Sequence, residues 1–248
     1  MSDSAGVPWE GRHFEHNASS DDDGSAPEKL IEAIRRFHAD DLGEADVVDA
    51  LRDSRLLIPL VAVLGEEGTN DHGHLVDKSQ ELSIVTVEGP DGRTVLPAFT
   101  SVDAMARWNP KARPVPATVR RVALAAASED TDVVVLDPVS DTEFVLRRPA
   151  LWALAQSRPW NPSYLDTDVL SVFMDAAEPE PSVVAVQLAP GDPDSRLAGP
   201  ELIVHLTLAP GLDRAALDAV LARLQERWAA SEVIAERVDS MRVVLGTS

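Results

Sequence analysis

Short apolar runs of the strand type alternate with stretches of helical periodicity throughout residues 27–248, and this alternation restricts the fold more than any other feature. The most apolar run, Leu56–Leu64, has the length and β-branched content of a buried strand, and Pro59 favours a place at its edge or start. The clearest helix is predicted over Asp213–Trp228, where leucine and valine recur at helical spacing. The sequence therefore predicts an α/β (α+β) fold.

The same patterns divide the chain. Residues 1–26 lack apolar periodicity and predict a flexible acidic tail. Residues 27–160 are predicted to form a mixed-sheet domain, in which strands at 82–87 and 94–99 make a hairpin and prolines near 110–116 mark a link. Pro159 and Pro162 indicate a linker. Residues 165–248 are expected to form a smaller β-β-α-β domain.

Composition excludes several classes of function. The chain holds 22 Lys and Arg against 42 Asp and Glu, a net charge of −20, and so acidic a surface argues against nucleic-acid binding. The absence of cysteine excludes thiol nucleophiles and Cys-ligated zinc. No run approaches the roughly 18 apolar residues of a membrane span, and no signal peptide opens the chain. We therefore expect a cytoplasmic protein with no membrane contact.

Residues 100–160 are nearly neutral, with 7 acidic and 8 basic side chains between two acidic flanks. The tripeptide Trp-Asn-Pro begins at Trp108 and again at Trp160, and Arg147-Arg148-Pro149 places two guanidinium groups at a predicted helix start, which attracts anions. Stacking and cation–π contacts at such side chains suit a protein partner or a small anionic ligand. The candidate binding residues are Trp108, Arg113, Arg120, Arg147, Arg148 and Trp160.

A structural interpretation of the same residues stays open. Asn-Pro terminates helices efficiently, so each indole would anchor a helix end. The two adjacent arginines would then pair with neighbouring acids such as Asp141 or Glu143. If they form a docking patch instead, we expect exchange of Arg147 and Arg148 for Glu to weaken partner capture and to leave thermal stability unchanged.

Catalytic motifs are missing from the sequence: it has no GxGxxG, GxxxxGK[ST], GxSxG or HExxH. The best metal-like cluster is Asp71-His72-Gly73-His74 with Asp77, because His-x-His in an extended segment points both imidazoles to one side. On that hypothesis the protein is a metal-dependent hydrolase that uses His72, His74 and Asp77. A solvated, Gly-punctuated loop explains the same residues, and no cofactor is predicted.

Three segments carry a resemblance to a known family. Leu96-Pro97-Ala98-Phe99-Thr100-Ser101, the helix that follows to Trp108, and the Ala-rich helix before Val133–Leu136 and Asp137-Pro138 resemble the SseB family, named for enhanced serine sensitivity. The similarity is of an actinobacterial type and covers about residues 27–160; residues 165–248 resemble the C-terminal SseB-type domain more loosely.

The resemblance implies an SseB-like mixed-sheet fold and a genetic phenotype around serine, and it supplies no catalytic residues. Together with the missing motifs, it predicts a non-catalytic cytosolic protein that binds a protein partner or a small anionic ligand. A role in serine or other amino-acid metabolism is the weaker alternative.

Overall fold

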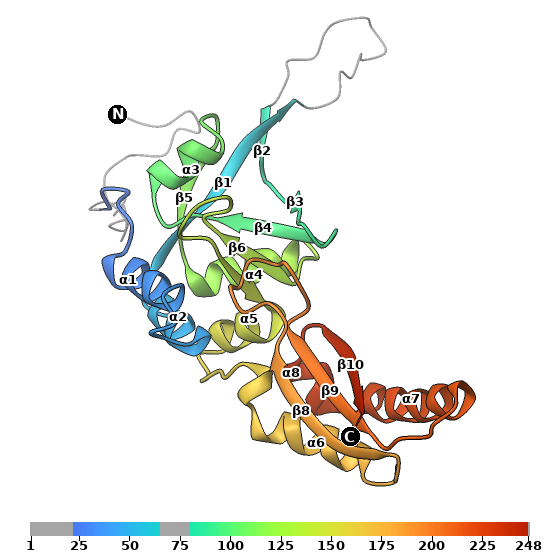
Figure 1. Ribbon diagram of the computed structural model, residues 1–248. Coiled ribbons are helices and arrows are strands. Elements are labelled where there is room, and N and C mark those ends of the chain that lie inside the picture. The colour runs from blue at the N-terminus through green and yellow to red at the C-terminus, as the bar shows by residue number, and fades with distance from the viewer. Residues whose placement is uncertain (1–21, 65–79, 248) are drawn as a thin grey trace, which may run out of the picture.

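The computed structural model describes residues 22–64 and 80–247, arranged as Figure 1 shows. The N-terminal part contains α1 (Glu28–Phe37), α2 (Glu44–Leu51), β1 (Arg55–Leu64), β2 (Gln80–Ile84), β3 (Val87–Glu88), β4 (Thr94–Ala98), α3 (Val102–Trp108), β5 (Arg113–Thr118), α4 (Val119–Ser128), β6 (Val133–Leu136), β7 (Phe144–Arg147) and α5 (Arg148–Ala155). The C-terminal part contains the 3₁₀ turn η1 (Ser163–Leu165), α6 (Thr167–Ala177), β8 (Val183–Pro190), β9 (Leu202–Leu208), α7 (Arg214–Ala229), α8 (Glu232–Arg237) and β10 (Met241–Thr247). Helices and strands mix, and the sheets hold parallel and antiparallel pairs, so the fold is α+β as predicted.

Two sheets form the N-terminal part. One is antiparallel with the order β2-β1-β5, and the other is mixed with the order β3-β4-β6-β7, in which β4 and β6 run parallel. They are joined where Leu57 and Phe99 exchange backbone hydrogen bonds. Apolar side chains of α1, α2, α4 and α5 pack on one face of the mixed sheet and make the largest hydrophobic cluster of the described residues.

The opposite face of the mixed sheet is covered by the loop between β8 and β9. Leu197 of this loop packs on Val133, Val135 and Val145. The backbone N–H of Val145 also donates to the carbonyl of Ser195, at 2.8 Å. Because both faces of the sheet are buried, β6 and β7 are apolar along most of their length rather than alternating.

The C-terminal part has a hydrophobic cluster of its own beneath a sheet with the order β10-β9-β8. Alternate residues of β9 are buried there, and Phe173 of α6 meets Trp228 of α7 edge-on, with 5.2 Å between ring centroids. Strand β9 is antiparallel to β8 and parallel to β10, because α7 and α8 carry the chain back before β10. The predicted β-β-α-β order is present, with α8 as an addition.

Two expectations about strands are wrong. The proline-rich link contains a strand, β5, which lies at the edge of its sheet. Proline has no N–H group, and an edge strand tolerates Pro114 and Pro116 because the missing N–H groups are on its unpaired side. The expected first strand of the hairpin is two separate strands: β2 pairs with β1, and only β3 pairs with β4. Pro59 sits inside β1, one residue before pairing with β2 begins at Leu60.

The end of the expected flexible tail is bound to the body of the protein. Arg55 donates hydrogen bonds to the Asp22 carboxylate and to the carbonyls of Ser25 and Thr100. Val102 N–H donates to the carbonyl of Gly24 at 3.0 Å. Residues 22–25 are therefore held in place, whereas residues 1–21 lie outside the described residues.

The residues that carry the family resemblance meet where the parallel strands β4 and β6 end. Asp137 is buried, has a φ of +42°, and accepts hydrogen bonds from Thr100 N–H at 2.8 Å, Thr100 Oγ1 at 2.6 Å and Thr142 Oγ1 at 2.8 Å. Aspartate is among the residues that tolerate this left-handed backbone best. Ser101 then begins α3 by accepting a bond from Ala104 N–H. These residues fix the turn after each strand.

Candidate functional site

Arg147, the first of the two predicted docking arginines, is buried between the N-terminal and C-terminal parts. It is 8% exposed. Its Nη2 donates to Asp192 Oδ2 at 2.6 Å and to the Gly199 carbonyl at 2.9 Å, and its Nη1 donates to Asp239 Oδ2 at 3.2 Å and to Ser240 Oγ at 3.4 Å. With these donors satisfied inside the chain, the guanidinium cannot serve as an exposed docking group, which corrects the sequence expectation.

The ion-pair interpretation of Arg147 is right in kind but names the wrong acids. The carboxylates that it contacts come from the β8–β9 loop and from the segment before β10, not from Asp141 or Glu143. Asp239 also pairs with Arg93, at 2.9 Å from Nη1. Arg147 is therefore a clamp between the two parts of the chain.

Arg148 is also engaged within the chain. Its two terminal nitrogens donate to the carbonyls of Ala235 and Val238, each at 2.8 Å, at the C-terminal end of α8. Its Cζ lies 4.9 Å from the ring centroid of Trp152, which is 45% exposed. A cation at this end of a helix is favourable because the last carbonyls are otherwise unsatisfied.

The structure does not bring the other predicted residues into one site. Trp108 ends α3 and packs on Phe99, with 5.3 Å between ring centroids, which is the anchoring role of the structural interpretation. Arg113 is exposed at the start of β5. Arg120 is exposed in the first turn of α4 and lines a separate hollow of about 330 Å³.

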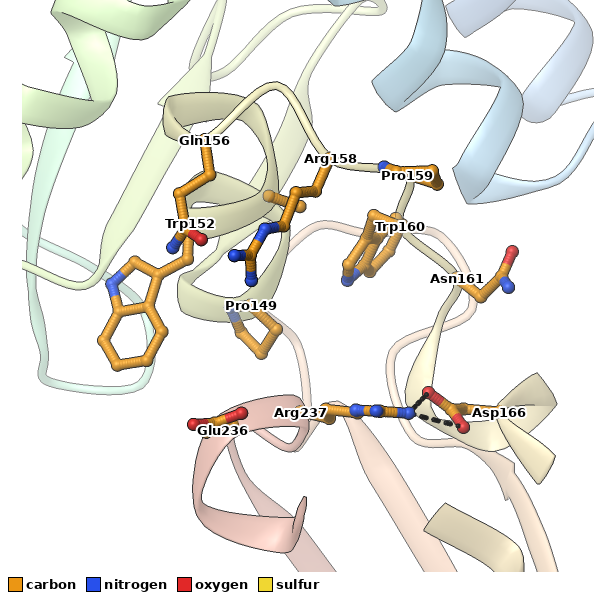
Figure 2. Close-up of a pocket in the computed structure, with 11 residues that line it drawn as sticks. Pro149, Trp152, Gln156, Arg158, Pro159, Trp160, Asn161, Asp166, Glu236 and Arg237 are labelled. Carbon is orange, nitrogen blue, oxygen red and sulfur yellow. Dashed lines mark hydrogen bonds and ion pairs between the residues drawn. The ribbon is translucent and has the colours of Figure 1, made fainter. Parts of the chain in front are cut away.

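Trp160, the remaining candidate, lines a pocket of about 370 Å³ that we call the α5–α8 pocket. Figure 2 shows its walls: the end of α5 and the segment after it on one side, and the start of α6 with the end of α8 on the other. Trp152, Trp160 and Pro149 supply apolar surface. Indole and amide groups in one pocket suit a ligand with both flat and polar parts.

Charges in the α5–α8 pocket are only partly neutralised. Arg237 is tied to Asp166 at 3.0 Å and to Asp168 at 2.8 Å. Arg158 is directed into the pocket (Figure 2), and it makes no ion pair with any residue in 22–64 or 80–247. Glu236, on the facing wall, has no ion pair within those ranges either. Among the described residues, the pocket thus presents one cation and one carboxylate that are in no ion pair.

Sequence reasoning missed most of this pocket. Arg158, two residues before Trp160, is among the arginines that could form a groove with the two tryptophans, but the adjacent Arg147 and Arg148 are the more conspicuous pair. Glu236 and Arg237 belong to α8, a helix that was not predicted. Only the folded chain places them opposite α5.

Two carboxyl groups, the half-buried Glu44 and the buried Glu201, lie in the interface beside Arg147. Burial, reinforced by the charge of Glu201, raises the pKa of Glu44 to about 7. Burial also raises the pKa of Glu201, which is 7% exposed and whose Oε1 has no hydrogen-bond partner in the described structure. The pKa of Tyr164 rises to about 12 through burial and the charges of both glutamates. Beside the ion pairs of Arg147, the interface therefore holds two glutamates and one tyrosine whose ionisation is disfavoured.

The residues of the metal hypothesis, His72, His74 and Asp77, fall in the segment 65–79, outside the described residues. Within residues 22–64 and 80–247, no group of three or more His, Asp or Glu side chains is placed to hold a metal ion. Among the described helices, none combines the length and the apolar character needed to span a bilayer.

Comparison with known proteins gives one match. The model of the SseB protein N-terminal domain matches residues 28–153, from the start of α1 into α5, which is about half of the chain and includes both N-terminal sheets. Searches of curated proteins and of solved structures found no match. The matched segment holds the Thr100–Asp137 turn described above. The chain therefore belongs to the SseB family.

Proposed function

We propose that the protein is a non-catalytic binding protein that holds a small anionic ligand, a carboxylate, in the α5–α8 pocket. The observation that carries this proposal is the Arg158 guanidinium, which points into a pocket of about 370 Å³ without an ion-pair partner among the described residues. An arginine fork matches the two oxygens of a carboxylate, and the charge-assisted bonds that result are the strong ones.

The size of the pocket favours a metabolite over a protein partner. Pockets for small molecules measure roughly 300–1,000 Å³, whereas a stable protein interface covers a broad surface of roughly 800 Å² on each partner. The exposed faces of Trp152 and Trp160 provide stacking surface on either side of Arg158. The ligand is therefore expected to carry a compact apolar or planar body beside its carboxylate.

We expect Arg158→Gln to raise the dissociation constant of such a ligand by about tenfold or more, since a hydrogen bond to a charged group contributes roughly 1.5–3 kcal/mol and about 1.4 kcal/mol is tenfold. Tryptophan fluorescence during titration with acetate, succinate and inorganic phosphate measures this, because two of the five tryptophans line the pocket. The melting temperature should stay that of the wild type, because Arg158 is exposed.

Arg113→Gln is the matched control, since it removes another exposed arginine that lies on β5. It should leave both the dissociation constant and the stability unchanged. Saturable binding that is equal in the wild type and in Arg158→Gln would count against the pocket, and so would the absence of a saturable response to every probe.

A second candidate ligand is a free amino acid, which would connect the protein to serine or other amino-acid metabolism. The observation that favours it is the Glu236 carboxylate on the wall facing Arg158, which is in no ion pair among the described residues and could pair with the ammonium group of an amino acid. L-serine should then bind more tightly than acetate, and Glu236→Gln should remove that preference while leaving acetate binding unchanged. Equal affinity for the two compounds would leave the simple carboxylate as the better candidate.

A further inference from the structure

The C-terminal sheet ends in an edge strand without the usual protection against pairing. Among the strands in residues 22–64 and 80–247, β10 has one neighbour, β9, and most of its residues are exposed, among them Val244 at 39% and Leu245 at 42%. Edge strands of natural proteins are commonly blunted by lysine, proline, inward-pointing charges or bulges. In Met241–Thr247 there is no lysine, proline or acid, and the single charge is Arg242.

The other edge of the same sheet does carry such protection. Strand β8 has a register irregularity between Val183 and Ala185 and ends at Pro190. A bulge twists an edge away from an incoming strand, and proline removes a donor from it. Of the two edges of this sheet in the described part of the chain, the one at β10 is therefore the unprotected one.

We propose that β10 pairs antiparallel with β10 of a second copy of this chain, about a two-fold axis through Val244, so that the two C-terminal sheets form one continuous six-stranded sheet. A two-fold axis brings the same patch of each copy together, which is the commonest symmetry of soluble oligomers.

The backbone fixes which residues of β10 can form the new hydrogen bonds, and the axis at Val244 pairs the most residues. Leu202 N–H donates to the carbonyl of Ser240, so the even-numbered residues that follow turn their backbone groups towards β9. The backbone groups of residues 241, 243, 245 and 247 then point to the free edge. Val243 faces Leu245 of the second copy and Met241 faces Thr247 of the second copy, both as hydrogen-bonded pairs. All seven residues of β10 are paired in this register.

Charge agrees with the same register. With the axis at Val244, each Arg242 lies opposite Gly246 of the second copy, so no like charges face each other across the new pair. An axis at Arg242 would set the two guanidinium groups against each other and shorten the pairing. A groove of about 600 Å³ lies beside Met241 and Arg242 at the start of β10, and Pro90 and Arg93 also line it.

The overall charge makes the association depend on salt. Each copy carries a net charge of −20, so two copies repel each other at low ionic strength. The pairing itself rests on backbone hydrogen bonds and apolar side chains, which salt does not weaken in this way. The dimer should therefore become tighter as the sodium chloride concentration rises, which is the reverse of an interface held by ion pairs.

The absence of cysteine allows a direct test by single-cysteine crosslinking. Val244→Cys should form a disulfide-linked dimer on mild oxidation, because opposed residues of a non-hydrogen-bonded pair have Cα atoms roughly 4.5 Å apart, within the range a disulfide spans. Arg242→Cys is the matched control on the same strand and the same face of the sheet. The two copies of residue 242 would be offset by four residues, roughly 13 Å, and should not link.

The second test measures the oligomeric state of the wild type and of Leu245→Pro by sedimentation velocity. The wild type should sediment as a dimer and Leu245→Pro as a monomer with an unchanged circular dichroism spectrum, because residue 245 turns its N–H away from β9. Any of three results overturns the proposal: a monomeric wild type at every salt concentration, Arg242→Cys linking as readily as Val244→Cys, or a dimer that survives Leu245→Pro.

Discussion

Replacement of Arg147 by methionine is expected to lower the free energy of unfolding by about 3 kcal/mol, the lower end of the cost of breaking a buried ion pair. Methionine fills much of the same volume but leaves Asp192 and Asp239 with one guanidinium fewer in a buried interface. The loss is limited because Asp192 keeps the backbone N–H groups of Leu197 and Ala198, and Asp239 keeps Arg93. Urea denaturation followed by far-ultraviolet circular dichroism measures the change.

Arg148→Met is the matched control for this prediction. Its guanidinium donates to two backbone carbonyls at the end of α8 and stacks on Trp152 near the surface, and its removal leaves no carboxylate without a partner, so we expect a smaller loss than for Arg147. Equal effects of the two substitutions on the free energy of unfolding would show that the ion pairs of Arg147 contribute no more to stability than the hydrogen bonds of Arg148. The sequence expectation that both arginines can be exchanged for Glu without loss of stability is wrong for Arg147, since a carboxylate there would face Asp192 and Asp239.

The second large effect expected is a fall in stability as the pH rises from about 4.5 to about 7. The pKa of Glu44 is about 7 in the folded chain against 4.5 for an ordinary glutamate, because the side chain lies in the interface near Glu201 and Asp192. The folded chain therefore binds more protons than the unfolded chain in this window, and its stability falls with rising pH. Such a difference in pKa corresponds to about 3 kcal/mol.

Glu44→Gln isolates this contribution, because glutamine cannot ionise. The variant should exceed the wild type in unfolding free energy by up to about 3 kcal/mol at pH 8 and lose that advantage below pH 4.5. Ser195 and Arg147, the other groups that act on Glu44, remain in place. Glu28→Gln, at the exposed first position of α1, controls for loss of a carboxylate from a helix N-terminus. A stability difference between Glu44→Gln and the wild type that does not vary with pH would contradict the assignment.

Local patterns in the sequence were sufficient for most helices and strands but not for their pairing. The apolar runs at β1, β6 and β9 and the periodicity of α7 each report which side of one element is buried. They do not report which strand lies next to which, and so the strand near residue 84 was assigned to a hairpin when it pairs with β1. Strand β5 was missed because its prolines read as a link unless the strand is known to be an edge.

The candidate site was harder to predict because its parts are distant in sequence. Arg147 meets Asp192 and Asp239, which lie 45 and 92 residues further along the chain, so nothing near Arg147 signalled that it is buried. Trp160 was recognised from its tripeptide, and it does line the pocket, but Glu236 lies across from it on a helix that was not predicted. A pocket formed by two separate parts of a chain has no local sequence pattern.

The binding proposal is tested most directly by the indole N–H signals of the five tryptophans in a two-dimensional ¹H–¹⁵N spectrum during titration with succinate. The proposal predicts that the signals of Trp152 and Trp160 shift together and saturate, that those of Trp108 and the buried Trp228 stay in place, and that Arg158→Gln moves the same shifts to succinate concentrations about tenfold higher or more. Shifts of Trp152 and Trp160 that persist unchanged in Arg158→Gln, or the same two signals standing still at every succinate concentration, would contradict it.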